Sequence, residues 1–182
     1  MTLKTYKPYT KSRRSTILVD RSELWKGKPY KPLTLIKNAS RGRNNLGRIT
    51  SRNHGGGHKQ RYRQIDFHRR KFDMAATVER IEYDPNRSCY IMLVKFEDGK
   101  KFYYLAPQNI KIGDKIKNGS NSEIKVGNCL PLKDIPVGIN IHNVELQPGA
   151  GGKVARSAGT SVTISGIDGN YSLIKMTSGE VR

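Results

Sequence analysis

The sequence predicts a mostly β protein with an extended basic N-terminal arm, and three observations support this. Short apolar runs separated by turn signals occupy the chain after residue 74, and no long helix or repeat is found. The charge is uneven: residues 1–72 carry 20 Lys and Arg against three acids, whereas residues 73–182 carry 14 against 12. A basic half joined to a nearly balanced half indicates a polyanion-binding arm attached to a folded module.

The arm is predicted over residues 1–74. Its most basic stretch, 41–71, holds ten of the 34 Lys and Arg residues, three of the four histidines and one acid. It has too little apolar surface to repay its ordering entropy, so we expect it to become ordered only against a dense array of negative charge. Leu24 and Trp25 are expected to anchor the earlier part of the arm in a pocket.

A solvated basic surface and a membrane-binding surface are the alternatives for this arm. Unpaired cations at this density repel one another, which argues against the first. An amphipathic helical pattern is absent, and the longest apolar run, Cys89–Val94, has the length of a strand rather than of a membrane span.

Residues 75–125 are predicted to form a small Greek-key or OB-like barrel. The period of two breaks between Val78 and Ile81, which predicts a β-bulge near Glu79-Arg80. The run Cys89–Phe96 has the composition of a buried strand, and Asp98-Gly99 predicts a tight hairpin after it. A short strand at Lys115–Lys117 and a surface loop at Asn118–Ser122 complete this part.

A second β domain is predicted over residues 126–182, with Pro131, Pro136 and Gly138 marking the boundary before its strands. Strands are expected at 139–146, 161–167 and 171–176, with a turn at Asp168-Gly169-Asn170. Ser178-Gly179 begins one more hairpin, and the sequence stops where a closing strand is expected. Cys89 and Cys129 are interpreted as reduced thiols.

Two spacings in the arm raise the question of a metal or a nucleotide. His54 and His58 have the i, i+4 spacing of a zinc pair, but the three glycines between them make the required helix improbable. The run Gly55-Gly56-Gly57-His58-Lys59 lacks the spacing of a P-loop. Its glycines still allow backbone N–H groups to approach phosphates closely. Zinc and other cofactors are therefore not expected, and no enzymatic constellation is found.

Aromatic and basic residues alternate at 61–63 and 67–72, a pattern suited to stacking on unpaired bases and contacting phosphates. The alternative is that Ile65, Phe67 and Phe72 anchor the arm on the barrel, and both interpretations stay open. In the balanced half, Arg87 and Arg156 follow turns and are expected to point outwards.

Several stretches together resemble the large-subunit ribosomal protein L2 (uL2) family of the bacterial type: VDRSELWKGKP, GRNNLGRITSRNHGGGHKQRYRQIDF, VERIEYDPNRSCYIMLV, VGNCLPLKDIPVGINIHNVEL and PGAGGKVARSAGT. The resemblance covers essentially all 182 residues. It implies an OB-like barrel followed by an SH3-like barrel whose last strand is missing, with extensions threaded into large-subunit rRNA. It also implies a structural, non-enzymatic role in subunit association and in assembly of the peptidyl-transferase region.

The predicted rRNA-binding residues combine the basic stretch, the glycine loop and the positions matched by the resemblance. They are Arg41, Arg43, Arg48, Arg52, His54, Gly55, Gly56, Gly57, His58, Lys59, Arg61, Arg63, Arg69, Arg70, Lys71, Arg87 and Arg156. Large-subunit rRNA and neighbouring ribosomal proteins are the expected partners, and the only metal expected is the structural Mg²⁺ of the rRNA.

The resemblance also has a departure, because family members continue for a further strand and a basic tail. A separate polypeptide supplying that part is hypothesised. The motif RRKFD resembles alphaproteobacterial members of the family, and the N-terminus aligns without room for a transit peptide. Both features predict a protein that is made inside a mitochondrion. Its predicted location is the large subunit of the mitochondrial ribosome, in the matrix. Bacterial cytoplasm or plastid is the alternative location, and a stand-alone RNA chaperone or single-stranded RNA-binding protein is the alternative function.

Overall fold

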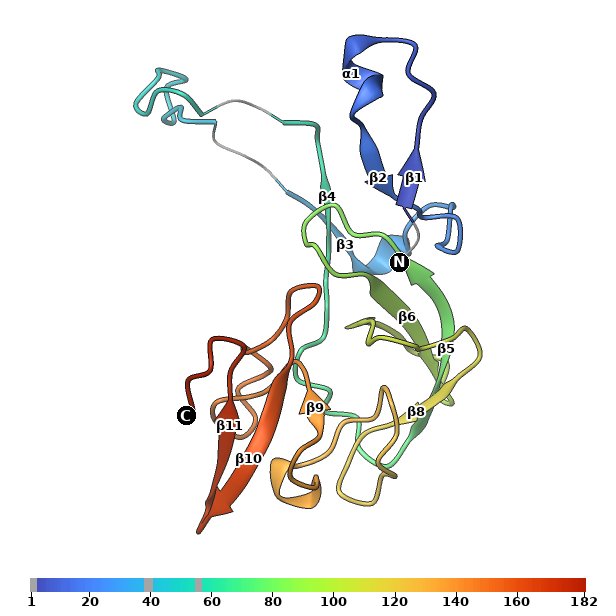
Figure 1. Ribbon diagram of the computed structural model, residues 1–182, viewed down its shortest axis with the longest axis vertical. Coiled ribbons are helices and arrows are strands. Elements are labelled where there is room, and N and C mark those ends of the chain that lie inside the picture. Colours follow the sequence, from blue (N-terminus) through green and yellow to red (C-terminus); the bar gives the residue numbers. More distant parts are fainter. Residues whose placement is uncertain (1–2, 38–40, 55–56) are drawn as a thin grey trace.

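The computed structural model describes residues 3–37, 41–54 and 57–182. Antiparallel strands dominate these residues and helix is confined to short single turns, which confirms the mostly β prediction. Figure 1 shows a body that contains two small sheets, with two long projections above it. The OB-like and SH3-like assignments, and the domain boundaries at residues 74 and 125, stay predictions.

The larger sheet has four strands in the order β7-β6-β5-β8: β5 (Ala75–Glu82), β6 (Ile91–Phe96), β7 (Lys101–Leu105) and β8 (Lys115–Lys117). Strand β6 is apolar at successive positions because both of its faces are covered. Met92, Val94 and Phe96 pack into one core with the flanking strands, whereas Ile91 and Leu93 face a second core on the other side.

Local turn and bulge chemistry in this sheet follows the sequence. The pairing of β5 with β6 shifts register between Val78 and Arg80, which confirms the predicted bulge. Gly99 has φ +79° in the hairpin between β6 and β7, and its N–H donates to the Phe96 carbonyl at 2.9 Å. A glycine accepts this left-handed conformation without strain.

The predicted surface loop at Asn118–Ser122 is wrong in one respect, because part of it is buried. Asn118 and Ser122 are 1% and 8% exposed. The Asn118 side chain donates to the Lys71 carbonyl at 3.1 Å, and the Asn118 backbone carbonyl accepts the Asp73 N–H at 2.9 Å. The loop therefore packs against the segment that enters β5.

The second face of the four-stranded sheet is covered by the arm. Ile65 is 8% exposed and packs on this face with the partly buried Tyr30, Leu33 and Phe67. The Asp66 N–H donates to the Tyr103 carbonyl at 3.0 Å, so the arm also pairs with the edge strand β7. Ile65 and Phe67 thus anchor the arm.

Other proposed anchors behave differently. Phe72 is 62% exposed and anchors nothing, and Trp25 is half exposed rather than held in a pocket. Trp25 is held instead by its backbone N–H, which donates to the Ile81 carbonyl at 2.8 Å, and by the Arg80 guanidinium, which lies 4.8 Å from the centre of the indole ring.

The smaller sheet has the order β11-β10-β9: β9 (Asn140–Ile141), β10 (Val162–Asp168) and β11 (Tyr171–Lys175). Val144, Val162 and Ile174 form its core. The predicted strand at 139–146 is therefore shorter than expected, and a short 3₁₀ turn, Leu132–Asp134, precedes it. Residues 180–182 turn back along β11, where Ile174 and Arg182 exchange backbone hydrogen bonds of 2.8 and 2.9 Å.

Two ribbons project from this body in Figure 1. The N-terminal hairpin pairs β1 (Leu3–Thr5) with β2 (Ile17–Val19) and carries the one-turn helix α1 (Lys11–Arg14). A 3₁₀ turn, Lys31–Leu33, leads into the second ribbon, which pairs β3 (Thr34–Ile36) with β4 (Arg61–Arg63).

Candidate nucleic-acid interface

The tip loop, residues 41–54, is a closed loop at the far end of the second ribbon (Figure 1). The Asn44 side-chain oxygen accepts the Arg48 N–H at 2.9 Å, and the Gly42 carbonyl accepts the Ser51 N–H at 3.1 Å. Gly42 has φ +68°, and a Cβ there would lie 2.1 Å from the Ser51 carbonyl oxygen. These hydrogen bonds give the loop a backbone conformation of its own, whereas the sequence predicted order only against a polyanion.

Cations cover the tip loop without any acid among them. Its residues line an open hollow that contains Arg41, Arg43, Ile49, Ser51, Arg52, Asn53 and His54. Leu46 and Ile49 are 74% and 61% exposed, so no apolar core holds the loop. Arg41, Arg43, Arg48, Arg52 and His54 are all exposed, as a direct contact with phosphates requires.

The glycine loop after the tip is described only in part. Gly55 and Gly56 lie outside the described residues, whereas Gly57, His58 and Lys59 are exposed. The His58 Nδ1 lies 3.0 Å from the Lys59 carbonyl oxygen.

Within the described ranges, no group of three or more His, Cys, Asp or Glu side chains is arranged to hold a metal ion. No helix in the same ranges is long and apolar enough to cross a membrane.

The arginines of β4 lie in different environments. Arg61 is exposed, but the Arg63 side chain is 12% exposed and its guanidinium lies 4.0 Å from the buried Asp84 carboxylate. Arg87 also differs from the expectation that it points outwards. Its Nε donates to Asp84 at 2.7 Å and its side chain is 17% exposed. The buried carboxylate draws both side chains toward the body, because a buried charge must be paired.

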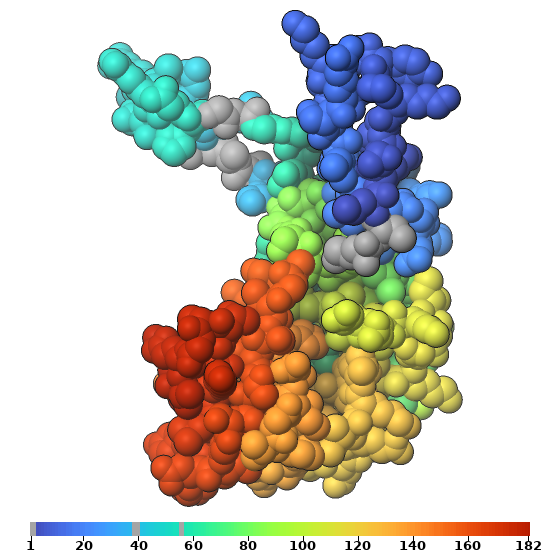
Figure 2. All heavy atoms as spheres, viewed as in Figure 1, coloured from blue at the N-terminus to red at the C-terminus, as the bar shows by residue number. Residues whose placement is uncertain are grey.

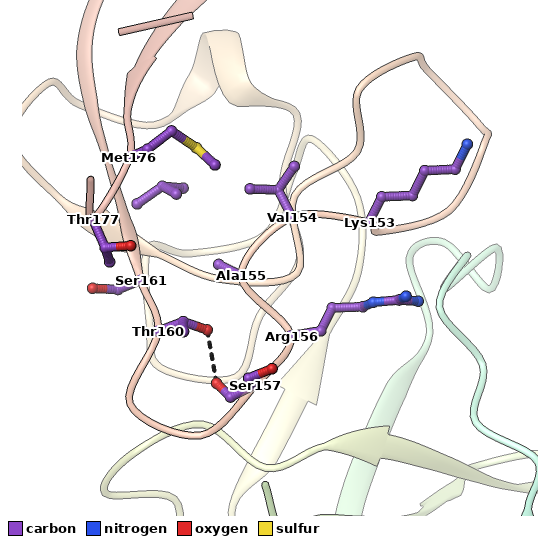
Figure 3. Close-up of a pocket in the computed structure, with 10 residues that line it drawn as sticks. Lys153, Val154, Ala155, Arg156, Ser157, Thr160, Ser161, Met176 and Thr177 are labelled. Atoms are coloured by element: carbon purple, nitrogen blue, oxygen red, sulfur yellow. Dashed lines mark hydrogen bonds between the residues drawn. The ribbon is translucent and has the colours of Figure 1, made fainter. Parts of the chain in front are cut away.

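Arg156 follows the outward expectation more closely. It is exposed, and its guanidinium lies 4.6 Å from the centre of the Phe67 ring. Figure 3 shows Arg156 and Lys153 extending in one direction from a hollow of about 340 Å³ beside β10. The hydroxyl-bearing Thr160, Ser161 and Thr177 lie on the other side of that hollow, and Thr160 donates to the Ser157 carbonyl at 2.7 Å.

Arg69 is the clearest difference from the sequence-based site, since it is only 6% exposed. Its guanidinium donates to the Gly127 carbonyl at 2.8 Å and lies 4.3 Å from the Tyr104 ring centre. Burial lowers the pKa of this guanidinium. The Arg69 side chain therefore faces the protein interior. It holds the backbone at Gly127 against the larger sheet and is not placed to contact a phosphate.

The neighbours of Arg69 are more accessible. Arg70 is exposed, with a guanidinium nitrogen 3.4 Å from the Gly149 carbonyl. Lys71 forms an ion pair with Asp98 and lies over the Phe96 ring, with its ammonium 4.9 Å from the ring centre. The hydrogen bond from Lys71 lowers the pKa of the Asp98 carboxyl. The Lys71 ammonium group is therefore already engaged by an acid and an aromatic ring of the body.

The N-terminal hairpin carries exposed cations that the sequence-based site omitted: Lys4, Lys7, Lys11, Arg13 and Arg14. Lys4 and Arg13 both lie within 6 Å of the Tyr6 ring centre. An available signal was the charge itself, because residues 1–14 contain five cations and no acid. Figure 2 shows this hairpin and the tip loop as separate projections from the body.

A mostly β body with two cation-covered extensions defines a class of protein suited to binding a polyanion. Two family models match the chain: "Ribosomal Proteins L2, RNA binding N-terminal domain" over residues 30–118, and "Ribosomal Proteins L2, C-terminal domain" over residues 125–182. The chain belongs to the uL2 family of large-subunit ribosomal proteins, which are structural and not enzymes.

Curated relatives agree with this family over the whole chain. It is 78% identical to the large ribosomal subunit protein uL2 of Pelagibacter ubique, 59% identical to that of Granulibacter bethesdensis and 56% identical to that of Rickettsia bellii. All 182 residues are covered in each case, and the chain spans 65%, 66% and 67% of the length of these relatives.

Proposed function

We propose that the chain is a structural constituent of a large ribosomal subunit and binds large-subunit rRNA. The observation that carries this proposal is the tip loop, where four exposed arginines lie without an acid on a projection from the body. Membership of the uL2 family supports rRNA as the polyanion. Each neutralised phosphate releases counterions, so binding is expected to weaken steeply with salt.

The proposed rRNA-binding residues are divided into direct and indirect contacts by the exposure of their side chains. The direct contacts are the exposed residues Arg41, Arg43, Arg48, Arg52, His54, Gly57, His58, Lys59, Arg61, Arg70 and Arg156. The side chains of Lys71 and Arg87 are 24% and 17% exposed, so each presents only a small part of its surface. Arg63 and Arg69 are proposed to act through the segments they hold in place.

Three finer points belong to the same proposal. Support of peptidyl-transferase assembly and of subunit association is inferred from the family resemblance. A mitochondrial ribosome stays a prediction, and so does the bacterial or plastid alternative, because 78% identity to a bacterial chain fits each of them. The separate polypeptide has no support among the relatives and stays a hypothesis; mass spectrometry of the purified ribosome tests it by seeking a peptide from such a tail.

Sedimentation separates the proposed function from the RNA-chaperone alternative. In sucrose gradients of ribosomes washed in high salt, a structural constituent stays with the large subunit, whereas a chaperone is lost to the top of the gradient. Sequencing the rRNA of that fraction identifies the ribosome as mitochondrial, plastid or bacterial. Recovery of the chain only in ribosome-free fractions would overturn the proposal.

A further inference from the structure

Three segments that are distant in the sequence meet at one place, here called the junction. They are the arm at 61–67, the turn at 84–88 after β5, and the loop at 152–158 before β10. The Gly152 N–H donates to the Phe67 carbonyl at 3.1 Å, and the Ala158 N–H donates to the Ser88 hydroxyl at 3.1 Å. The junction therefore links the arm and the two sheets directly.

Asp84 organises the turn at the junction. The carboxylate is completely buried, and it accepts the Asn86 N–H at 3.0 Å and the Arg87 Nε at 2.7 Å. Asn86 in turn donates to the Arg61 carbonyl at 2.8 Å, which fastens the turn to β4. A buried carboxylate with charge-assisted hydrogen bonds holds its partners in fixed positions.

Phe67 contacts one arginine from the turn after β5 and one from the loop before β10. The Arg87 guanidinium lies 5.8 Å from its ring centre and the Arg156 guanidinium lies 4.6 Å from it. Both distances are within the range of a cation–π interaction. One aromatic ring from the arm thus brings together a cation from the turn after β5 and a cation from the loop before β10.

We infer that Phe67 and Asp84 are positioning residues that hold Arg87 and Arg156 as one composite site for an RNA backbone. The inference rests on the proposed function and adds that the two arginines depend on each other through the Phe67 ring. Arg156 also donates to the Gly152 carbonyl at 3.3 Å, and the Phe67 carbonyl accepts the Gly152 N–H, so Phe67 contacts this guanidinium through its ring and positions its hydrogen-bond acceptor through its backbone.

The first test measures whether Arg156 depends on the Phe67 ring. The full chain is titrated with a full-length bacterial large-subunit rRNA transcript. Arg156→Gln is expected to weaken binding by about fivefold in the native chain but by less than twofold in the Phe67→Leu background, because the second chain no longer presents Arg156. An equal loss in both backgrounds overturns the inference.

Two further variants separate positioning from folding. Phe67→Tyr keeps the ring face and is expected to bind within twofold of the native chain. Tyr171→Leu makes a matched aromatic-to-leucine change at a site that is 79% exposed at the hairpin between β10 and β11, and is also expected to bind normally. Loss of binding in Phe67→Tyr with an unchanged melting temperature counts against a role for the ring.

For Asp84→Asn, the direction of the change in RNA affinity decides between two roles of the carboxylate. If the carboxylate only repelled phosphate, removing its charge would strengthen RNA binding. A positioning role predicts the opposite, a loss of about threefold to tenfold, because Arg87 loses its charged partner. A gain in affinity overturns the inference, as does an unchanged affinity in a folded variant.

The controls distinguish failure of this inference from failure of the proposed function. If the native chain binds poly(U) as tightly as the rRNA transcript at the same salt, specific rRNA binding itself fails. If the native chain discriminates between the two RNAs but the Phe67 and Asp84 variants bind like it, only the positioning role fails.

Discussion

The tip loop and the junction both carry several arginines, but they place them in opposite environments. In the tip loop the arginines are exposed, no acid is present, and backbone hydrogen bonds rather than an apolar core hold the chain. At the junction a single buried carboxylate, Asp84, draws Arg63 and Arg87 toward the body, and Phe67 lies beneath Arg87 and Arg156. One acid and one ring therefore hold the side chains of the junction arginines in fixed positions, whereas the tip arginines have no such partners.

The largest effect is expected from breaking the exposed side of this comparison. Changing Arg41, Arg43, Arg48 and Arg52 together to Gln removes four phosphate partners. We expect rRNA affinity at moderate salt to fall by roughly 10²–10³-fold and the salt dependence to become shallower by about three to four units of slope. Filter binding across a salt series measures both, and an unchanged slope would show that these arginines do not contact phosphates. The melting temperature should stay constant, because exposed substitutions change stability little.

A substitution in the buried anchor tests the opposite side. Ile65→Ala removes apolar atoms from a side chain that is 8% exposed on the four-stranded sheet. The expected cost is about 2–4 kcal/mol of unfolding free energy, with no change in the salt slope of rRNA binding. Urea denaturation gives the stability, and Leu35→Ala, at a site 52% exposed on the neighbouring ribbon, is the matched control.

The buried tyrosines Tyr103 and Tyr104 make the stability of the body depend on pH. Burial raises the pKa of Tyr103 to about 12, and the same cause raises the pKa of Tyr104 to about 12. In the unfolded chain both titrate near pH 10, so between about pH 10 and 12 the unfolded state binds fewer protons than the native state. Stability is therefore present below pH 10 and falls as the pH rises through this window.

Tyr103→Phe isolates one of these two groups. The Tyr103 hydroxyl donates to Glu82 at 3.0 Å and accepts the Tyr30 N–H at 2.8 Å, so its loss is expected to cost about 1–3 kcal/mol at pH 8. The variant should then lose less stability than the native chain between pH 9.5 and 11.5. Urea titrations at both pH values measure the difference, and parallel losses would contradict the role assigned to Tyr103.

The smallest effect is expected for a cation that belongs to neither region. Lys125 is exposed and pairs with the exposed Glu123. Lys125→Gln should change rRNA affinity by less than about twofold and stability by less than about 0.5 kcal/mol, because exposed ion pairs contribute little. A loss equal to that of Arg156→Gln in the same binding assay would mean that net charge, rather than a defined surface, governs binding.

Features governed by neighbouring residues could be predicted from the sequence. The bulge after Val78 follows from a break in apolar alternation, and the hairpin at Gly99 follows from an Asp-Gly pair between two apolar runs. Exposure of the tip arginines follows from a stretch that has no acid and only two large apolar residues, Leu46 and Ile49. In each case the information lies within a few residues of the feature.

Features governed by distant partners could not be predicted. The burial of Arg69 depends on the Gly127 carbonyl and the Tyr104 ring, which come from other parts of the chain. The inward turn of Asn118 depends on the Lys71 carbonyl, and the loop composition alone gives no sign of that contact. A basic residue in a basic stretch looks the same in the sequence whether it faces solvent or a buried carbonyl.

The tip loop and one segment of the junction, residues 61–67, lie close together in the chain, since Phe67 follows shortly after β4. Once either one is bound to RNA, the other is held near the same molecule at an effective concentration on the order of millimolar. Two individually weak, salt-sensitive contacts then act together as a bivalent attachment. Dissociation requires both to open at once, so the residence time on RNA should exceed what either contact gives alone.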